Sequence, residues 1–478
     1  MRNKFSLSHT RLLTCDMGEL VPIGLTEILP GDSVQHSCSA LVRAAPLTAP
    51  PMHPLEVRIH HWFVPARLVW DNFDDMITGG PAGTSLPPYP TVNFASAIAV
   101  GTLADYFGLP TGTAGLTLSA IPFRMYQLIW NEWYRDQDLE TAAVISTADG
   151  ADTTTDRNMK NCAWEKDYFT SSRPWEQKGP AISIPLGTTA PVVFTEGGTS
   201  PGTRTLLRAA GGAGTSLNIV EAGTASDPIT AAANLSGAST ITVNALRTAM
   251  ALQRYEENRA RYGSRYVEYL RMLGIKSSDA RLQRPEFLGG GKQLVQFSEV
   301  LTTGVNGTDP VGTMKGHGIT AMRSNRYRRF FEEHGYIMSL MSTRPKTMYL
   351  SGLPRTFNRR AKEDYWQPEL QHLGQQAVLN KEVYAAHATP DGTFGYQDRY
   401  DEYRRMESGV SGEFRTTLNN WHFARAFGST PALNATFVSC VPPETPFAAP
   451  ASDVLWIMAK HSIQARRLVT PVGKSFIF

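Results

Sequence analysis

The 478-residue sequence has few cysteines and no long apolar run. Its four cysteines, Cys15, Cys38, Cys162 and Cys440, are far apart and form no CxxC pair, which excludes a zinc ribbon and a thioredoxin-like centre. They are therefore predicted to be free, buried thiols in a reducing cytoplasm. No apolar stretch reaches the roughly 20 residues that a membrane-spanning helix needs, and residues 1–9 lack the apolar core of a secretory signal. We expect a protein assembled in a cytoplasm, without membrane insertion.

Excess charge of either sign is also small. The 46 Lys and Arg residues nearly cancel the 43 Asp and Glu residues, which leaves a formal net charge of +3. A protein whose main role is to bind nucleic acid usually carries a larger, clustered positive charge. Any contact with nucleic acid must therefore be local.

Motifs for catalysis and metal binding are missing as well. Residues 289–292 (GGGK) lack the GxxxxGK[ST] spacing of a phosphate-binding loop, and neither GxSxG nor HExxH occurs. His60 and His61 are adjacent on a predicted strand, so their side chains point to opposite sides and do not easily share an ion with His53. We predict no enzyme, no catalytic residue, no metal site and no cofactor.

Turn-forming residues and strand patterns are abundant. Forty Gly and 31 Pro favour an all-β framework with long loops. Residues 55–63 alternate between apolar and polar, the pattern of a strand with one buried face. Further strands are predicted over residues 19–29, 33–43, 336–343, 433–440 and 454–462. The last contains four consecutive apolar residues (LWIM), which indicates a strand buried in the sheet or at a subunit contact.

Two predicted helices flank a segment of biased composition. Apolar and aromatic residues at spacings of three and four predict helices over residues 122–135 and 244–273. Between them, residues 187–243 are rich in Gly, Thr, Ala and Ser and contain five charged residues. We predict a projecting, β-rich surface loop, with a flexible linker as the alternative. Strands near both ends that enclose long insertions are typical of a jelly roll, here a single domain over residues 1–478.

Two basic clusters contain aromatic residues. The first consists of Arg323, Arg326, Arg328 and Arg329 around Tyr327 and Phe330, and the second of Arg355, Arg359, Arg360 and Lys362 around Phe357. Guanidinium groups beside aromatic rings suit single-stranded nucleic acid, because they combine phosphate pairing with base stacking. These seven arginines are our candidates for contact with DNA. The alternative is that they pair with carboxylates across subunit contacts.

Several ordered motifs resemble one known family. In chain order they are residues 20–23 (LVPI), 27–32 (EILPGD), 62–72 (WFVPARLVWDN), 122–124 (PFR), 131–137 (NEWYRDQ), 168–171 (YFTS), 174–180 (PWEQKGP), 279–286 (DARLQRPE), 333–336 (EHGY), 379–382 (LNKE) and 395–400 (GYQDRY). Together they resemble the major capsid proteins of microviruses, single-stranded-DNA bacteriophages, and most closely the gokushovirus branch.

The resemblance implies a viral, eight-stranded antiparallel jelly roll that assembles into a T=1 icosahedral shell around a circular single-stranded DNA genome. It also implies other copies of the chain, a small basic DNA-binding protein, and pilot and scaffolding proteins as partners in the virion. Residues 187–243 occupy the position of the family's variable threefold protrusion, so we expect them to contact the host cell surface. Two alternatives are a soluble carbohydrate-binding or enzymatic jelly roll and a soluble single-stranded-DNA-binding protein. Particle size distinguishes both from a shell.

Overall fold

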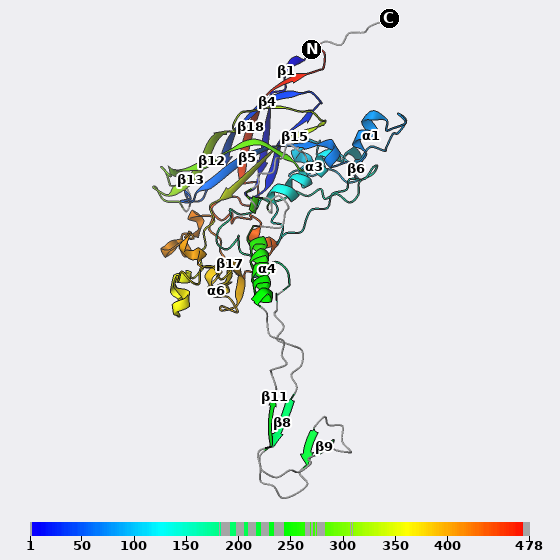
Figure 1. Ribbon diagram of the computed structural model, residues 1–478. Coiled ribbons are helices and arrows are strands. Elements are labelled where there is room, and N and C mark those ends of the chain that lie inside the picture. Colours follow the sequence, from blue (N-terminus) through cyan, green and yellow to red (C-terminus); the bar gives the residue numbers. More distant parts are fainter. Residues whose placement is uncertain are drawn as a thin grey trace. The chain divides into compact units, whose positions relative to one another are not determined.

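The computed structural model describes residues 2–180, 182, 192–196, 205–208, 217–220, 229–233, 243–262, 268, 271–272, 274, 283–305, 307 and 309–471. The chain divides into two compact units: the first comprises Met1–Glu176 and Arg259–Phe478, and the second comprises Gln177–Asn258. The first unit contains the sheet labelled in Figure 1. No helix within the described ranges is both long and apolar enough to cross a membrane.

One antiparallel sheet of ten strands forms the framework of the first unit. Eight strands follow the order β1-β18-β4-β13-β12-β5-β15-β3, while β2 pairs with β18 and β14 pairs with β4. The bounds are β1 Asn3–Ser6, β2 His9–Cys15, β3 Leu20–Ile28, β4 Ser33–Ala44, β5 Leu55–Pro65, β12 Glu286–Leu301, β13 Met314–Arg323, β14 Tyr327–Phe330, β15 Gly335–Pro345 and β18 Leu455–Arg467. Strands from the two ends of the chain thus pair with each other, and the mainly β, jelly-roll-like fold confirms the predicted fold class.

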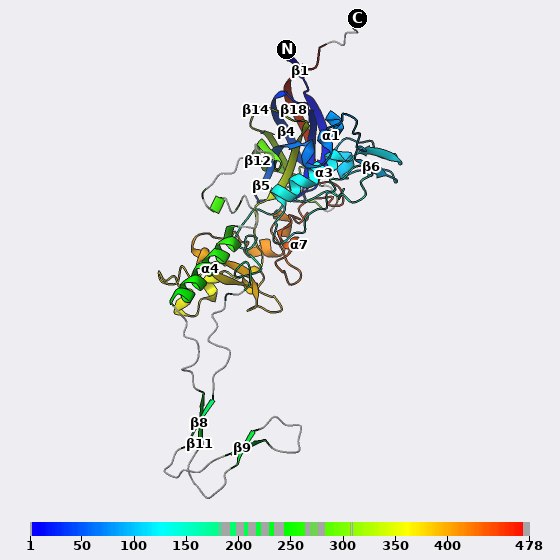
Figure 2. The ribbon, with the colours of Figure 1, turned by 45° about the vertical axis from the view of Figure 1, so that its right-hand side comes forward.

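The sheet curls so that strands distant in its order face each other (Figures 1 and 2). His461 on β18 lies 3.0 Å from the carbonyl oxygen of Ile23 on β3, although β3 is the last strand of that order. Alternate residues of a strand point to the same side, so these strands line a shared core with every second side chain. Val42 and Leu455 belong to that core together with Ile23.

Helices cover the other face of part of the sheet. Helix α3 (Ile121–Ile129) continues into a π-helical turn over Trp130–Tyr134, which confirms the helix predicted over residues 122–135. Its apolar residues pack against β5 and β15 (Figure 2). Around it lie α1 (Phe73–Thr78), α2 (Leu103–Tyr106) and the hairpin of β6 (Thr91–Phe94) and β7 (Leu116–Ser119). This layer explains why β5 is apolar towards its end: Trp62 and Val64 meet the helical layer.

A smaller core holds the segment that follows β15. It contains Tyr349, Val378 and Phe437, and its elements are β16 (Gln375–Leu379), α6 (Asn380–Val383), β17 (Thr393–Asp398) and α7 (Ala435–Val438). The strand predicted over residues 433–440 is wrong, because this stretch contains α7. The Asn434 side chain accepts a hydrogen bond from the Phe437 N–H at 3.1 Å, an N-cap that favours a helical turn over an extended chain.

Two features of the sequence have local explanations in the sheet: the apolar run in β18 and the glycine run at residues 289–291. β18 does alternate: Leu455 and Ile457 are buried, whereas Trp456 is 46% exposed and Met458 is 42% exposed. The glycine run at 289–291 lies in β12, where a Cβ atom on Gly290 would be 2.3 Å from the Ile59 carbonyl oxygen of β5. These glycines therefore permit close strand pairing.

The second unit contains two short antiparallel strand pairs. β8 (Val192–Glu196) pairs with β11 (Ile229–Ala233), and β9 (Thr205–Arg208) pairs with β10 (Leu217–Val220). Helix α4 spans Val243–Tyr262; the helix predicted over residues 244–273 overlaps it, and most of its remainder lies outside the described residues. Most of residues 187–243 also lies outside them, so the projection of this loop stays a prediction.

Candidate nucleic-acid interface

The face of the sheet directed away from the core carries six basic residues on five strands. They are Lys4, Arg43, Arg323, Arg328, Lys460 and Arg466, and all are exposed. The register places them on one face, because directly opposite residues of antiparallel strands share a side. Arg466 is opposite both Lys4 and Ser33, Lys460 and Arg323 are each opposite Ser39, Arg43 is opposite Trp456, and Arg328 is opposite Gln35. We call this surface the basic sheet face.

The basic sheet face carries positive charge that no acidic residue on its own strands compensates, although Asp105 and Asp453 line a hollow together with Arg43 and Trp456. None of its six basic residues makes an ion pair within the described part of the chain, and no Asp or Glu occupies this side of β1, β2, β4, β13, β14 or β18. Its six charges exceed the net charge of +3 for the whole chain. Apolar side chains lie among the cations, since Leu12, Phe330, Trp456 and Met458 are all more than 40% exposed on the same side. Phosphate pairing and base stacking are therefore both possible here.

The first predicted cluster is divided by the sheet. Arg323 and Arg328 belong to the basic sheet face, and Arg326 is exposed in the connection between β13 and β14. Arg329 is opposite Val34, a core residue, and forms an ion pair of 2.7 Å with Glu286. Two of the four arginines thus share a surface with Lys4, Arg43, Lys460 and Arg466.

The second predicted cluster lies in a network of carboxylates within the subunit. Arg355 is 3.0 Å from Glu382 and 3.6 Å from Glu402. Burial raises the pKa of Glu382 even with that guanidinium beside it. Arg359 lies over the Tyr403 ring, 4.3 Å from its centroid, and 3.8 Å from Glu402. Arg360 is exposed. The geometry therefore favours the first cluster for DNA contact.

Four of these basic residues lie outside the two predicted clusters. Lys4 and Arg43 are the only Lys or Arg residues of β1 and β4, whereas Lys460 and Arg466 both belong to β18. Only strand pairing brings them beside Arg323 and Arg328. Period-two alternation could have indicated which side each one occupies on its strand, but not which strands are neighbours.

The histidines that suggested a metal site are separated. On β5, His61 points into the core between Ser339 and Ser324, at 2.8 and 2.9 Å, whereas His60 hydrogen-bonds the Tyr134 hydroxyl on the other side. His53 lies 2.7 Å from the Lys346 carbonyl oxygen. Among the residues that the structure describes, no group of three His, Cys, Asp or Glu side chains is arranged to hold a metal ion.

A separate histidine cluster lies inside the curled sheet. His36 on β4 is 3.0 Å from His461 on β18 and 2.9 Å from the Tyr327 hydroxyl. The His61 ring is 4.5 Å from that of His36, and His9 on β2 stacks on His461 at 4.8 Å. Burial and the neighbouring His461 and His9 lower the pKa of His36 to about 3, and burial and His9 lower that of His461 to about 4. The His36 and His461 rings are therefore neutral, hydrogen-bonded core residues near neutral pH.

Jelly rolls form viral capsid proteins as well as lectins and cupins, and the relatives of this chain distinguish between these classes. The chain matches the family described as "Capsid protein (F protein)", of phage origin, over residues 1–470. It is 36% identical over 466 residues to capsid protein VP1 of Bdellovibrio phage phiMH2K, covering 91% of this chain and 87% of that protein. It is 32% identical to capsid protein VP1 of Chlamydia phage 1 and 30% identical to that of Spiroplasma virus 4, covering 91% of this chain and 89% and 87% of theirs.

The chain therefore belongs to the F-protein family of phage capsid proteins, which includes those of microviruses. Its role is structural and not enzymatic: it is a component of the virion that associates with other copies of itself in a shell. The resemblance first seen in the ordered sequence motifs is confirmed.

Proposed function

We propose that this chain assembles, in the cytoplasm of a bacterial host, into a T=1 icosahedral shell that encloses a circular single-stranded DNA genome. The basic sheet face contacts the genome. The observation that carries this assignment is the placement of six cations on one side of the sheet. Within the described residues they make no ion pair, and their strands carry no carboxylate on that side.

The physical argument rests on complementary chemistry. Phosphates pair with the guanidinium groups of Arg43, Arg323 and Arg328, while unpaired bases stack on exposed Trp456 and Phe330. Six charges per subunit neutralise only part of a packaged genome, so we propose a small basic DNA-binding protein as a partner. Pilot and scaffolding proteins complete the proposed set of partners, as the family resemblance implies.

Replacing Arg323 and Arg328 with glutamine should weaken DNA binding without preventing shell formation. Each phosphate contact on single-stranded DNA contributes about 0.7 to the slope of log affinity against log salt, so the double variant should lower that slope by about 1.4. Sedimentation of particles from cells that also express the natural partners measures assembly. A salt titration with single-stranded DNA measures the slope.

The matched control replaces Arg404 and Arg405 with glutamine. This pair removes the same charge, but both arginines bind Asp401 within the subunit, at 3.5 and 2.6 Å, so the slope should not change. An equal decrease in both double variants would contradict the assignment of the genome-facing surface. If the unmodified chain forms only small oligomers in the presence of its partners, the shell itself is refuted, and the soluble DNA-binding and carbohydrate-binding alternatives return.

We also propose that residues 187–243 project from the shell near a threefold axis and contact the host surface. The segment has five charged residues, and its described strands form two separate two-stranded pairs, of which β9 and β10 are a hairpin. An isolated hairpin is marginally stable in water. Three copies that meet on an axis would cover one another's apolar faces and leave Thr and Ser outside.

Deleting residues 188–242 should yield particles that assemble but no longer attach to host cells. The jelly-roll strands all lie outside this segment, and surface loops tolerate such changes better than the elements they connect. Assembly is measured by sedimentation and attachment by the fraction of particles bound to cells. Attachment at the level of the unmodified particle would refute the receptor role.

A further inference from the structure

Two of the four cysteines face each other on neighbouring extended segments. Ala163 and Ser439 form an antiparallel bridge, and the Cys440 N–H donates to the Cys162 carbonyl oxygen at 2.8 Å. Residues one step from such a bridge are directly opposite, with Cα atoms about 5.5 Å apart. That separation lies within the range that a disulfide requires. Both thiols are free, and they are buried together with Trp164.

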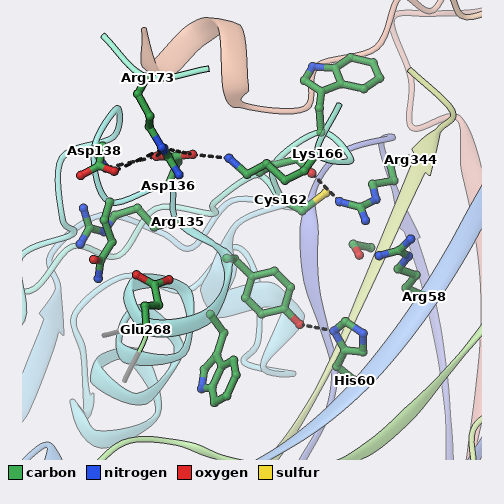
Figure 3. A pocket seen from close by; sticks show the side chains of 16 residues that line it. Arg58, His60, Arg135, Asp136, Asp138, Cys162, Lys166, Arg173, Glu268 and Arg344 are labelled. Atoms are coloured by element: carbon green, nitrogen blue, oxygen red, sulfur yellow. Dashed lines mark hydrogen bonds and ion pairs between the residues drawn. The ribbon is translucent and has the colours of Figure 1, made fainter. Parts of the chain in front are cut away.

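Cys162 also lies in the wall of a cavity lined with both cationic and carboxylate side chains. The cavity has a volume of about 370 Å³, and Cys162, Arg58 and Arg344 all line it. Figure 3 shows the sulfur of Cys162 on the side of the Arg344 guanidinium, which donates to the Ala163 carbonyl oxygen at 2.7 Å. A small oxidant that enters this cavity therefore meets Cys162 in its wall, although the residue is only 2% exposed.

The environment separates the roles of the two thiols. A hydrogen bond from the Cys440 thiol, together with the charges of Arg344 and Arg58, lowers the pKa of Cys162 despite burial. Burial raises the pKa of Cys440. The thiolate is the reactive form of cysteine, and a neighbouring thiol can resolve its first oxidation product. Cys162 is thus the nucleophile and Cys440 the resolving residue.

We propose that Cys162 and Cys440 form a peroxide-sensitive pair that closes to an intramolecular disulfide. The Cys162 thiolate attacks one oxygen of hydrogen peroxide, the O–O bond breaks, and the hydroxide that leaves takes up a proton to become water. The sulfur of Cys440, as it loses its proton, attacks the resulting Cys162 sulfenic acid and displaces its hydroxyl group as a second water. Two thiols are oxidised and one peroxide is reduced to two waters.

The other two cysteines provide internal controls. Burial raises the pKa of Cys38 to about 12, and burial together with the carboxylates of Glu19, Asp453 and Asp16 raises that of Cys15. Neither residue lines the cavity that contains Cys162. Both should stay reduced while Cys162 and Cys440 are oxidised.

The test exposes the folded, full-length protein to hydrogen peroxide, then alkylates the remaining thiols under denaturing conditions and maps them by mass spectrometry. We expect alkylation to fall from four residues to Cys15 and Cys38, together with a cross-linked peptide pair containing Cys162 and Cys440 that reduction separates. Cys440→Ser should leave a sulfenic acid on Cys162 that a dimedone probe labels, whereas Cys162→Ser should leave the other three thiols reduced. The measurement on the unmodified chain decides the question even if a variant fails to fold. The proposal would be overturned if Cys162 were still completely alkylated after peroxide treatment. Oxidation of Cys15 and Cys38 at the same rate as Cys162 and Cys440 would also overturn it.

Discussion

Replacing Arg124 with alanine should destabilise the subunit by about 3–5 kcal/mol, the cost of breaking a buried ion pair by removing one partner. Arg124 and Asp152 have no exposed side-chain surface and are 2.7 Å apart. Arg124 also donates to the carbonyl oxygens of Val69 and Ala148, each at 2.9 Å. The variant therefore leaves a buried carboxylate and two carbonyl groups without their partner. Urea unfolding of the purified protein measures the loss.

Lys346→Ala is the matched control for this prediction. Lys346 also pairs with a carboxylate, Glu165 at 3.1 Å, but the two side chains are 51% and 39% exposed. Exposed pairs contribute about 0–1 kcal/mol, because water already solvates both charges. A similar small loss in both variants would mean that burial of the Arg124–Asp152 pair does not make the loss of one partner costly.

The second large effect is a loss of stability in acid that the buried histidines cause. Burial and the neighbouring His36 and His461 lower the pKa of His61 well below its usual value. The pKa values of His36 and His461 are lowered to about 3 and about 4. The unfolded chain binds these protons below about pH 6.5, whereas the folded chain does not. The stability that they contribute is therefore complete above that pH and decreases as the pH falls towards 4. Each histidine contributes a slope of about 1.4 kcal/mol per pH unit.

Comparison of variants separates the contribution of the histidines to the pH dependence of stability from that of the carboxylates. Glu444 acts in the opposite direction, because burial, and then the nearby Asp16 and Glu19, raise its pKa to about 7. His61→Gln should reduce the decrease in unfolding free energy between pH 6.5 and 4.5 by about 1.4 kcal/mol per pH unit. His317→Gln changes an exposed histidine and should leave the decrease as it is. If the unfolding free energy of the unmodified protein, His61→Gln and His317→Gln depended on pH in the same way, protonation of the buried histidines would not limit stability in acid.

The sequence predicted most of what depends on local pattern. Alternation over residues 55–63 indicated β5, and apolar spacing over residues 122–135 indicated α3 and the turn after it. The expectation for residues 433–440 failed because a run of β-branched and aromatic residues is compatible with both strand and helix. The hydrogen bond from the Phe437 N–H to the Asn434 side chain favours the helix over the strand. That bond forms only where the chain turns at Asn434, which the sequence pattern does not show.

The candidate sites depended on contacts between distant residues. The basic cluster containing Arg355 and Arg359 resembled the one containing Arg323 and Arg328 in sequence, yet the first pair binds Glu382 and Glu402. Nothing near Arg355 in the sequence indicates that pairing, because both carboxylates belong to elements that lie later in the sequence. Similarly, Cys162 and Cys440 are 278 positions apart and become opposite only through the bridge between Ala163 and Ser439.

The sequence by itself determined that the protein is mainly β, that it belongs with phage capsid proteins, and that it lacks the motifs of an enzyme. Composition, two-residue periodicity and ordered motifs are properties of short segments, so they can be read before the chain folds. Only the tertiary structure decided which basic residues share a face, which histidines meet in the core, and which two thiols are opposite each other. Periodicity fixes the side of a strand on which a residue lies, but the neighbours of that strand are chosen by pairing across the whole chain.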